Sequence, residues 1–172
     1  SLMLYGCPAL AASLGDGSRH LAAQGKLTAL ALMNCGLQQL PTTLAALPAI
    51  ETLDFKFNEQ LSDLPQHLAC LPCLRELNME RCNVRRVPKV LGGGLASRLE
   101  RLDLSFNSNL IVDDEGLRIL SALPALTCLR MSFIGRWPSA ELEKELQQAL
   151  PVSCTIDIQV LQPTRMHPST IR

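Results

Sequence analysis

Hydrophobic residues in this chain recur with two periods, one within short segments and one between them. Within a segment, apolar and polar residues alternate, as they do at Leu53, Asp54 and Phe55. Alternation of this kind predicts a β-strand that has one face in a core and the other in solvent. Similar segments return at intervals along most of the chain. The pattern therefore predicts a stack of short strands that are equivalent to one another.

The recurring segment occurs five times, with apolar residues at its first, fourth and sixth positions and Asn or Cys at the ninth position of the first four copies. The spacings between copies are 23, 24, 25 and 27 residues, since the copies begin at Leu27, Ile50, Leu74, Leu99 and Leu126. The pattern LxxLxLxx(N/C)xL, with a period of roughly 20–29 residues, resembles leucine-rich repeats over about residues 2–160. This resemblance implies an α/β fold: a right-handed solenoid with a parallel sheet on the concave face and short helical, extended or turn returns on the convex face.

The ninth position of the repeat carries a residue that can hydrogen-bond inside a turn. We expect its amide or thiol to point inward and to donate to backbone carbonyls that the turn leaves unpaired. This structural interpretation is favoured over metal or redox chemistry. The residues concerned are Cys7, Cys35, Asn58, Cys82 and Asn107.

The segments that return from one strand to the next are of two kinds. The first three contain a proline, which favours an extended or tight-turn return over a full helix; these prolines are Pro41, Pro65 and Pro88. In the fourth, Asp113 is expected to cap a helix with Asp114 and Glu115 in its first turn, so helix capping explains this acidic run better than metal binding. The resemblance thus implies a mixture of typical LxxLP and ribonuclease-inhibitor-like repeats.

The chain is expected to form one domain with distinct ends. Near the C-terminus, Ser139 is predicted to cap a helix, and alternation from Cys154 to Val160 predicts a closing strand. The N-terminus begins inside a repeat without a polar cap, so we expect the sequence to be part of a longer protein. The predicted divisions are an irregular N-terminal repeat at 1–26, five motifs at 27–134, a capping helix and strand at 135–161, and a loosely ordered tail at 162–172.

Composition and charge narrow the classes of partner. Hydrophobic residues make up 47% of the chain and aromatic residues only 3%, which suits a core of many similar small layers. The net charge is zero, and Glu76, Glu80 and Glu100 dilute the basic cluster around Arg85 and Arg86. Nucleic acid is therefore an unlikely partner. No apolar stretch reaches the roughly 18 residues of a transmembrane helix, so membrane insertion is not expected.

The number of cysteines bears on whether the protein resides in a reducing or an oxidising cellular compartment. The chain has seven cysteines, an odd number, and no Asn-x-Ser/Thr acceptor site. The first residues also lack the charged and apolar regions of a signal peptide. We therefore expect a reducing, cytoplasmic location. Related modules serve in signalling, cytoskeletal and ciliary assemblies, so the resemblance adds the cytoskeleton as a possible setting.

The candidate binding surface consists of residues between the inward-facing leucines. These residues should form columns across the exposed sheet face, where an aromatic column beside mixed charges suits a protein partner. A second interpretation stays open, in which the aromatic rings stack only to cover the sheet edge. The candidate residues are Asp54, Lys56, Phe57, Asn78, Glu80, Arg81, Asp103, Phe106, Arg130 and Phe133.

No catalytic arrangement can be assembled from the sequence. Cys70 and Cys73 form a lone CxxC without further zinc ligands, His20, His67 and His167 belong to no motif, and Gly92–Gly94 lacks the rest of a phosphate loop. The favoured prediction is a noncatalytic scaffold or adaptor that binds a protein and needs no cofactor or metal. The alternatives are a recognition domain of a larger signalling enzyme and a redox or zinc protein that uses Cys70 and Cys73.

Overall fold

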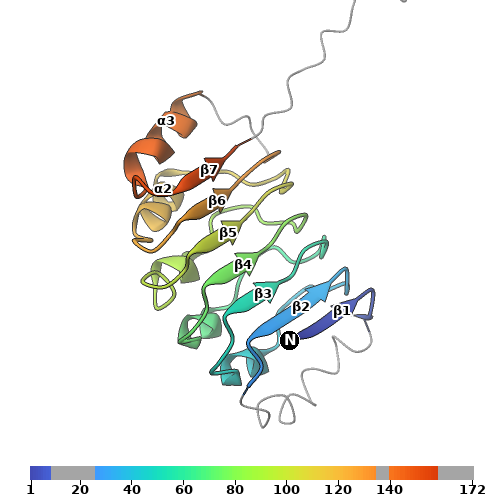
Figure 1. Cartoon of the computed structure of the whole chain (residues 1–172). Helices are drawn as coiled ribbons and strands as arrows, with labels where there is room; N and C mark the ends of the chain where they lie inside the picture. Colours follow the sequence, from blue (N-terminus) through green and yellow to red (C-terminus); the bar gives the residue numbers. More distant parts are fainter. Residues whose placement is uncertain (9–25, 135–139, 159–172) are drawn as a thin grey trace, which may run out of the picture.

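A computed structural model of the chain describes residues 1–8, 26–134 and 140–158 (Figure 1). Its main feature is one open sheet of seven strands that follow each other in chain order, and every neighbouring pair is parallel. The predicted α/β solenoid is confirmed. The strands are β1 (Leu2–Tyr5), β2 (Ala29–Met33), β3 (Thr52–Asp54), β4 (Glu76–Asn78), β5 (Arg101–Asp103), β6 (Cys128–Arg130) and β7 (Thr155–Asp157).

The register of the sheet aligns the repeats position by position. Leu53 of β3 pairs with Leu77 of β4, and Asp54 pairs with Asn78. A shift of one residue would move every apolar side chain to the solvent face, so the alternating pattern fixes this register. The fourth position of the repeat is consequently a column of buried leucines from β2 to β6: Leu30, Leu53, Leu77, Leu102 and Leu129.

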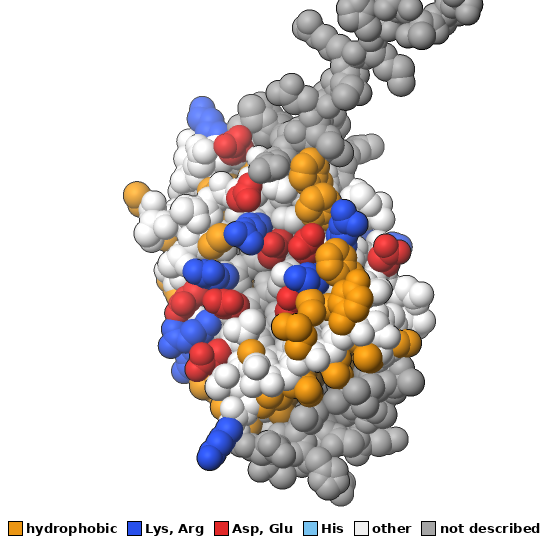
Figure 2. Space-filling model, turned by 45° about the vertical axis from the view of Figure 1, so that its right-hand side comes forward, with side chains coloured by type: hydrophobic (Ala, Val, Ile, Leu, Met, Phe, Trp, Pro, Cys, Tyr) orange, Lys and Arg blue, Asp and Glu red, His pale blue; other side chains and the backbone are white. Residues whose placement is uncertain are grey.

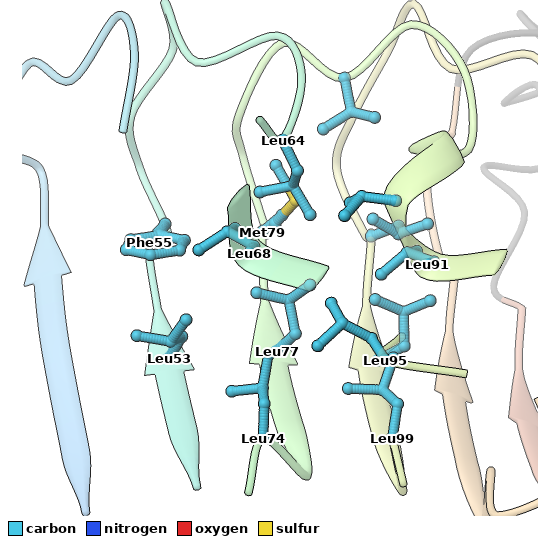
Figure 3. Close-up of a cluster of buried hydrophobic side chains, with 14 of the residues drawn as sticks. Leu53, Phe55, Leu64, Leu68, Leu74, Leu77, Met79, Leu91, Leu95 and Leu99 are labelled. Carbon is cyan, nitrogen blue, oxygen red and sulfur yellow. The ribbon is translucent and has the colours of Figure 1, made fainter. Parts of the chain in front are cut away.

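The core lies between the inner face of the sheet and the returning segments. Figure 3 shows Leu53 and Phe55 pointing to the same side of the ribbon as Leu77 and Met79 from the next repeat. Phe55 and Met79 are fully buried, as is Leu68 from the return segment between them. Each repeat therefore adds a thin apolar layer that is closed only by its neighbours.

Asn58 carries the predicted inward hydrogen bonds at the ninth position. Its Nδ2 donates to the carbonyl oxygens of Leu32 at 2.8 Å and Phe55 at 2.6 Å. Its Oδ1 accepts from the backbone N–H groups of Cys35 and Leu37, both at 3.0 Å. The side chain thus satisfies the backbone of its own turn and of the preceding repeat.

Cys82 and Asn107 act in the same way one and two repeats further on. Asn107 Nδ2 donates to the carbonyls of Met79 and Leu104, and its Oδ1 accepts from the N–H of Val84. The thiol of Cys82 donates to the carbonyl of Phe55 at 3.4 Å. Burial raises the pKa of this thiol to about 12, so it stays protonated at neutral pH. The structural interpretation of the ninth position is confirmed.

Short helices lie on the opposite side of the solenoid from the exposed sheet face (Figure 1). The three proline-containing returns each form one short 3₁₀ helix directly after the proline, which holds an extended backbone. This is the tight return that proline favours, because its fixed φ suits the start of a helix. The helices are η1 (Thr42–Ala46), η2 (Gln66–Cys70) and η3 (Lys89–Gly92).

The fourth return is an α-helix, α2 (Asp114–Ser121), and it begins at the predicted cap. Asp113 accepts a hydrogen bond from the N–H of Gly116 at 2.9 Å. This bond, together with the nearby positive charge of Arg86, holds the pKa of Asp113 below its usual range. The predicted cap is confirmed.

Helix α3 (Ala140–Ala149) and strand β7 close the described part of the chain. Leu146 and Leu150 are buried, as the predicted apolar face of this helix requires. The predicted cap Ser139, the strand end at Val160, the tail at 162–172, His20 and His167 lie outside the described residues.

The glycine run of the third return ends η3 and enters the turn that follows it. A Cβ at Gly94 would collide with the carbonyl oxygen of Ala69. Glycine is needed there because two backbone segments approach closely.

Candidate functional site

The outward side chains of β2 to β6 form the exposed face of the sheet, here called the outer sheet face. Figure 2 shows two zones on it, an apolar zone and a zone where acidic and basic side chains alternate. The alternating zone comes from residues that point away from the core on neighbouring strands. Its charged members on the central strands are Asp54, Glu76, Arg101, Asp103 and Arg130.

Opposite charges face each other across neighbouring strands in this zone. Arg101 is the strand partner of Glu76, with Nε and Oε1 3.7 Å apart, and Arg130 is the partner of Asp103 at 3.9 Å. Exposed pairs of this length contribute little stability, about 0–1 kcal/mol each. The Arg101 and Arg130 side chains remain 66% and 59% exposed, so they can still meet a ligand.

Three predicted site residues also have a structural role that the sequence did not indicate. Oδ1 of Asp54 accepts a hydrogen bond from the N–H of Lys56, and Asp103 does the same for Ser105. Asn78 accepts from Glu80 at 2.9 Å. The backbone turns away after these strands, and the short side chains satisfy the N–H two residues later. Their presence on the outer face is therefore explained in part by the turn.

The next column along the strands departs from prediction. By alternation, Met33, Ser105 and Ser132 occupy the same outward column as Lys56 and Glu80, yet they are only 8%, 5% and 6% exposed. The hydroxyl of Ser105 accepts from the N–H of Ser132, whose own hydroxyl donates to Asp157. These small side chains bond between adjacent repeats instead of reaching into solvent.

The apolar zone contains the four residues here called the rim ladder: Phe57, Arg81, Phe106 and Phe133. The structure brings all four together. The rings of Phe106 and Phe133 stack with centroids 4.7 Å apart. The Arg81 guanidinium lies 4.9 Å from the Phe106 ring and 5.8 Å from the Phe57 ring. Phe106 is nonetheless 38% exposed.

Every member of the rim ladder has a left-handed backbone, with φ between 51° and 65°. That conformation costs a non-glycine residue roughly 1–2 kcal/mol. Stacked aromatic pairs contribute about 0.5–1.5 kcal/mol and exposed cation–π contacts about 0.5–1 kcal/mol. The one stacked pair and the two cation–π contacts do not offset a backbone cost that all four residues bear, so stacking alone gives a weak reason for the ladder.

Two concave features compete as binding sites. A hollow of about 170 Å³ on the outer sheet face is lined by both charge pairs and by Asn78. A larger groove of about 630 Å³ runs between η2, η3 and α2 on the other side. Its charged walls are joined by ion pairs of Arg86 with Asp113 and of Lys89 with Glu115. Both features are thus lined by paired charges, but the outer sheet face also carries exposed aromatic rings beside them, which is the composition of a protein interface, so the outer sheet face is favoured.

The sequence analysis did not include Glu76 and Arg101 among its candidates. Both line the hollow and pair with each other. Their position directly before the inward leucine of each strand was the available signal, since it also faces outward. Glu59 was missed as well. It lines a rim hollow of about 430 Å³ with Arg81 and Phe106.

The remaining sequence candidates lie apart from the outer sheet face. Cys70 and Cys73 are exposed, and all seven cysteines, which lie in the described residues, are free. The His67 Nε2 lies 3.2 Å from the carbonyl oxygen of Pro41 and so links two returns. Within residues 1–8, 26–134 and 140–158, no group of three His, Cys, Asp or Glu side chains is placed to hold a metal ion. None of the helices in these ranges is long and apolar enough to cross a membrane.

The match to a protein-family model supports the repeat architecture. The leucine rich repeat family model matches residues 25–84. Among solved structures, a leucine-rich repeat protein from Leptospira interrogans matches with a TM-score of 0.48 and 19% identity, covering 80% of this chain and 44% of that one. No curated protein sequence matched. Proteins with this fold commonly act as noncatalytic protein-interaction modules.

The family match covers the first copies of the motif, and the strand ladder extends the same register to the later ones. The chain therefore contains leucine-rich repeats.

Proposed function

We propose that this protein is a noncatalytic interaction module, a scaffold or adaptor, that binds a partner protein on its outer sheet face. The observation that supports this most is the contrast between the two faces of one sheet. The inner face repeats leucine, whereas the outer face changes residue type from strand to strand. Core packing requires the first pattern and does not require the second.

The outer sheet face also has the mixed chemistry of a protein interface. Aromatic rings and arginines lie beside charge pairs that stay accessible, and aromatic and Arg side chains are enriched where proteins bind each other. The rim ladder supplies the apolar part, and Arg101 and Arg130 supply exposed cations. A cytoplasmic setting, in which the cysteines stay reduced, is part of the proposal; the seven free thiols support it.

A charge-reversal experiment tests which face of the protein binds the partner. The chain is immobilised and proteins from its native source are captured by the wild type, by Arg101→Glu/Arg130→Glu, and by the control Arg85→Glu/Lys89→Glu. The control changes the same number of exposed cations in the groove between η2, η3 and α2. We expect a captured protein whose affinity falls about tenfold or more with the first variant and little with the second.

The reverse ranking would contradict the proposal. If the groove variant loses the partner and the sheet variant keeps it, the partner binds the helical side. Circular dichroism of both variants should match that of the wild type, because all four residues are exposed.

A further inference from the structure

The rim ladder occupies a position whose backbone is the same in six successive repeats. In each, one residue of the turn that follows the strand adopts a positive φ, from 51° to 65°. Glycine and asparagine adopt this conformation most readily, and they occupy the first two positions. The following four carry bulky side chains. The six residues are Gly6, Asn34, Phe57, Arg81, Phe106 and Phe133.

The turn itself does not call for these bulky side chains. The N–H of Gly6 donates to the carbonyl of Met33 at 3.0 Å, and the N–H of Phe106 donates to Ser132 at 2.7 Å. The same inter-repeat bond therefore forms with glycine and with phenylalanine. Asn34 makes it too, to Lys56 at 3.1 Å. Strained conformations of bulky residues persist mainly where another role requires them.

The spacing of the rim ladder restricts the shape of a partner. Its members lie in the turns that follow neighbouring strands, and the Phe106 and Phe133 centroids are 4.7 Å apart. Same-face side chains repeat about every 5.4 Å along an α-helix but about every 6.6 Å along an extended strand. Over the three steps from Phe57 to Phe133, side chains of a helix fall out of step with the ladder by about 2 Å and those of a strand by about 6 Å. A helix that crosses the strands matches better.

The charges beside the rim ladder restrict the partner further. Lys56 pairs with Asp54, and the Arg81 guanidinium is held over aromatic rings. By contrast, Glu59 and Glu80 belong to none of the ion pairs among the described residues. Glu59 shares a hollow with Arg81 and Phe106. Arg81 is also in none of these ion pairs, but two carboxylates against one guanidinium leave the charge next to the rings negative.

We propose that the rim ladder binds an amphipathic helix of the partner, with apolar side chains one turn apart on the rings and Lys or Arg facing Glu59 and Glu80. This inference rests on the proposed function and adds the kind of segment that is bound. The helix-in-groove mode uses this spacing of anchors, and the carboxylates set its orientation and salt dependence.

Two matched peptide libraries test the inference. One displays a three-turn helical scaffold with one face randomised, and the other displays extended, proline-containing peptides of equal length. Both are selected on the chain, and the winning peptides are titrated by fluorescence polarisation. We expect helical winners with apolar residues one turn apart and with Lys or Arg. Phe57→Asn or Phe106→Asn should weaken the binding of each winning peptide by about tenfold or more. Glu80→Gln should weaken it by about threefold at low salt.

Asparagine is chosen because Asn34 already occupies the equivalent position of an earlier repeat, so these variants should fold. Phe106→Leu, which keeps an apolar side chain, should lose less affinity than Phe106→Asn. The matched control is Val152→Asn, which removes a fully exposed apolar side chain away from the rim ladder and should leave affinity unchanged.

The remaining outcomes separate the two proposals. Winners that lose affinity with Arg101→Glu/Arg130→Glu but not with the Phe variants would overturn the ladder inference and leave the proposed function standing. Winners from the extended library alone would overturn the helical partner. Binding lost only with Arg85→Glu/Lys89→Glu would overturn both proposals, whereas the absence of any ladder-dependent winner would overturn the ladder inference alone.

Discussion

Phe55 and Phe57 lie two residues apart and end up in opposite environments. Phe55 is fully buried among the leucines of the inner face, whereas Phe57 stands on the rim ladder with a left-handed backbone. The first ring is held by packing from its own and neighbouring repeats. The second contacts mainly Lys56 and Arg81 at the surface. The role of an aromatic residue in this chain therefore depends on whether its position in the repeat faces the core or solvent.

Replacing Phe55 gives the largest expected effect. Phe55→Ala should lower the free energy of unfolding by about 3–5 kcal/mol, because it opens a cavity between repeats that cannot close independently. Urea denaturation followed by circular dichroism measures this difference. A loss as small as that of Phe57→Asn would contradict the contrast between the two faces.

Removal of Asn107 tests the turn that separates inner from outer positions. Asn107→Ala leaves the N–H of Val84 and the carbonyls of Met79 and Leu104 without their partner. Each buried orphan group costs about 1–3 kcal/mol, so we expect a loss of about 3 kcal/mol or more. The control is Asn109→Ala, which removes an exposed amide and should change the same denaturation midpoint very little.

The cap of α2 gives an intermediate, pH-dependent effect. Asp113→Ala should cost about 1 kcal/mol at neutral pH. Since the pKa of Asp113 is lowered in the folded state, its contribution is complete above the ordinary value of 3.8 and is lost as pH falls through the lower, folded pKa. Denaturation midpoints of wild type and variant should therefore converge in acid.

Asp113→Asn separates the charge from the hydrogen bond of this cap. Asparagine also caps helices, so this variant should retain most of the stability at neutral pH. The difference in unfolding free energy between Asp113→Asn and Asp113→Ala should stay constant as pH falls. A wild-type advantage over alanine that survives at the lowest pH would show that the carboxylate charge is not involved.

Substitution on the rim ladder gives the smallest change in stability. Phe106→Asn removes ring contacts but relieves the left-handed backbone, so the unfolding free energy should shift by no more than about 1 kcal/mol. Urea denaturation of the variant and of the wild type measures this shift. A loss comparable to that of Phe55→Ala would mean that the ladder is a structural cover, which is the interpretation left open by the sequence.

Much of the fold could be predicted because local rules agreed with one another. Alternation placed the leucines, proline placed the tight returns, and Asp113 marked the start of α2. The candidate surface was less predictable. Ser105 and Ser132 occupy outward positions by alternation, but hydrogen bonds to the next repeat bury them. The strand pattern alone gives no sign of such bonds.

The sequence by itself determined the repeat, the register and the inward ladder of Asn and Cys, because each follows from a spacing that every repeat obeys. Only the tertiary structure decided that Arg81 lies between aromatic rings and that Glu59 faces the same hollow. The physical reason is distance along the chain. Side chains more than twenty residues apart become neighbours only when the strands stack, and their contacts depend on backbone angles that no single repeat shows.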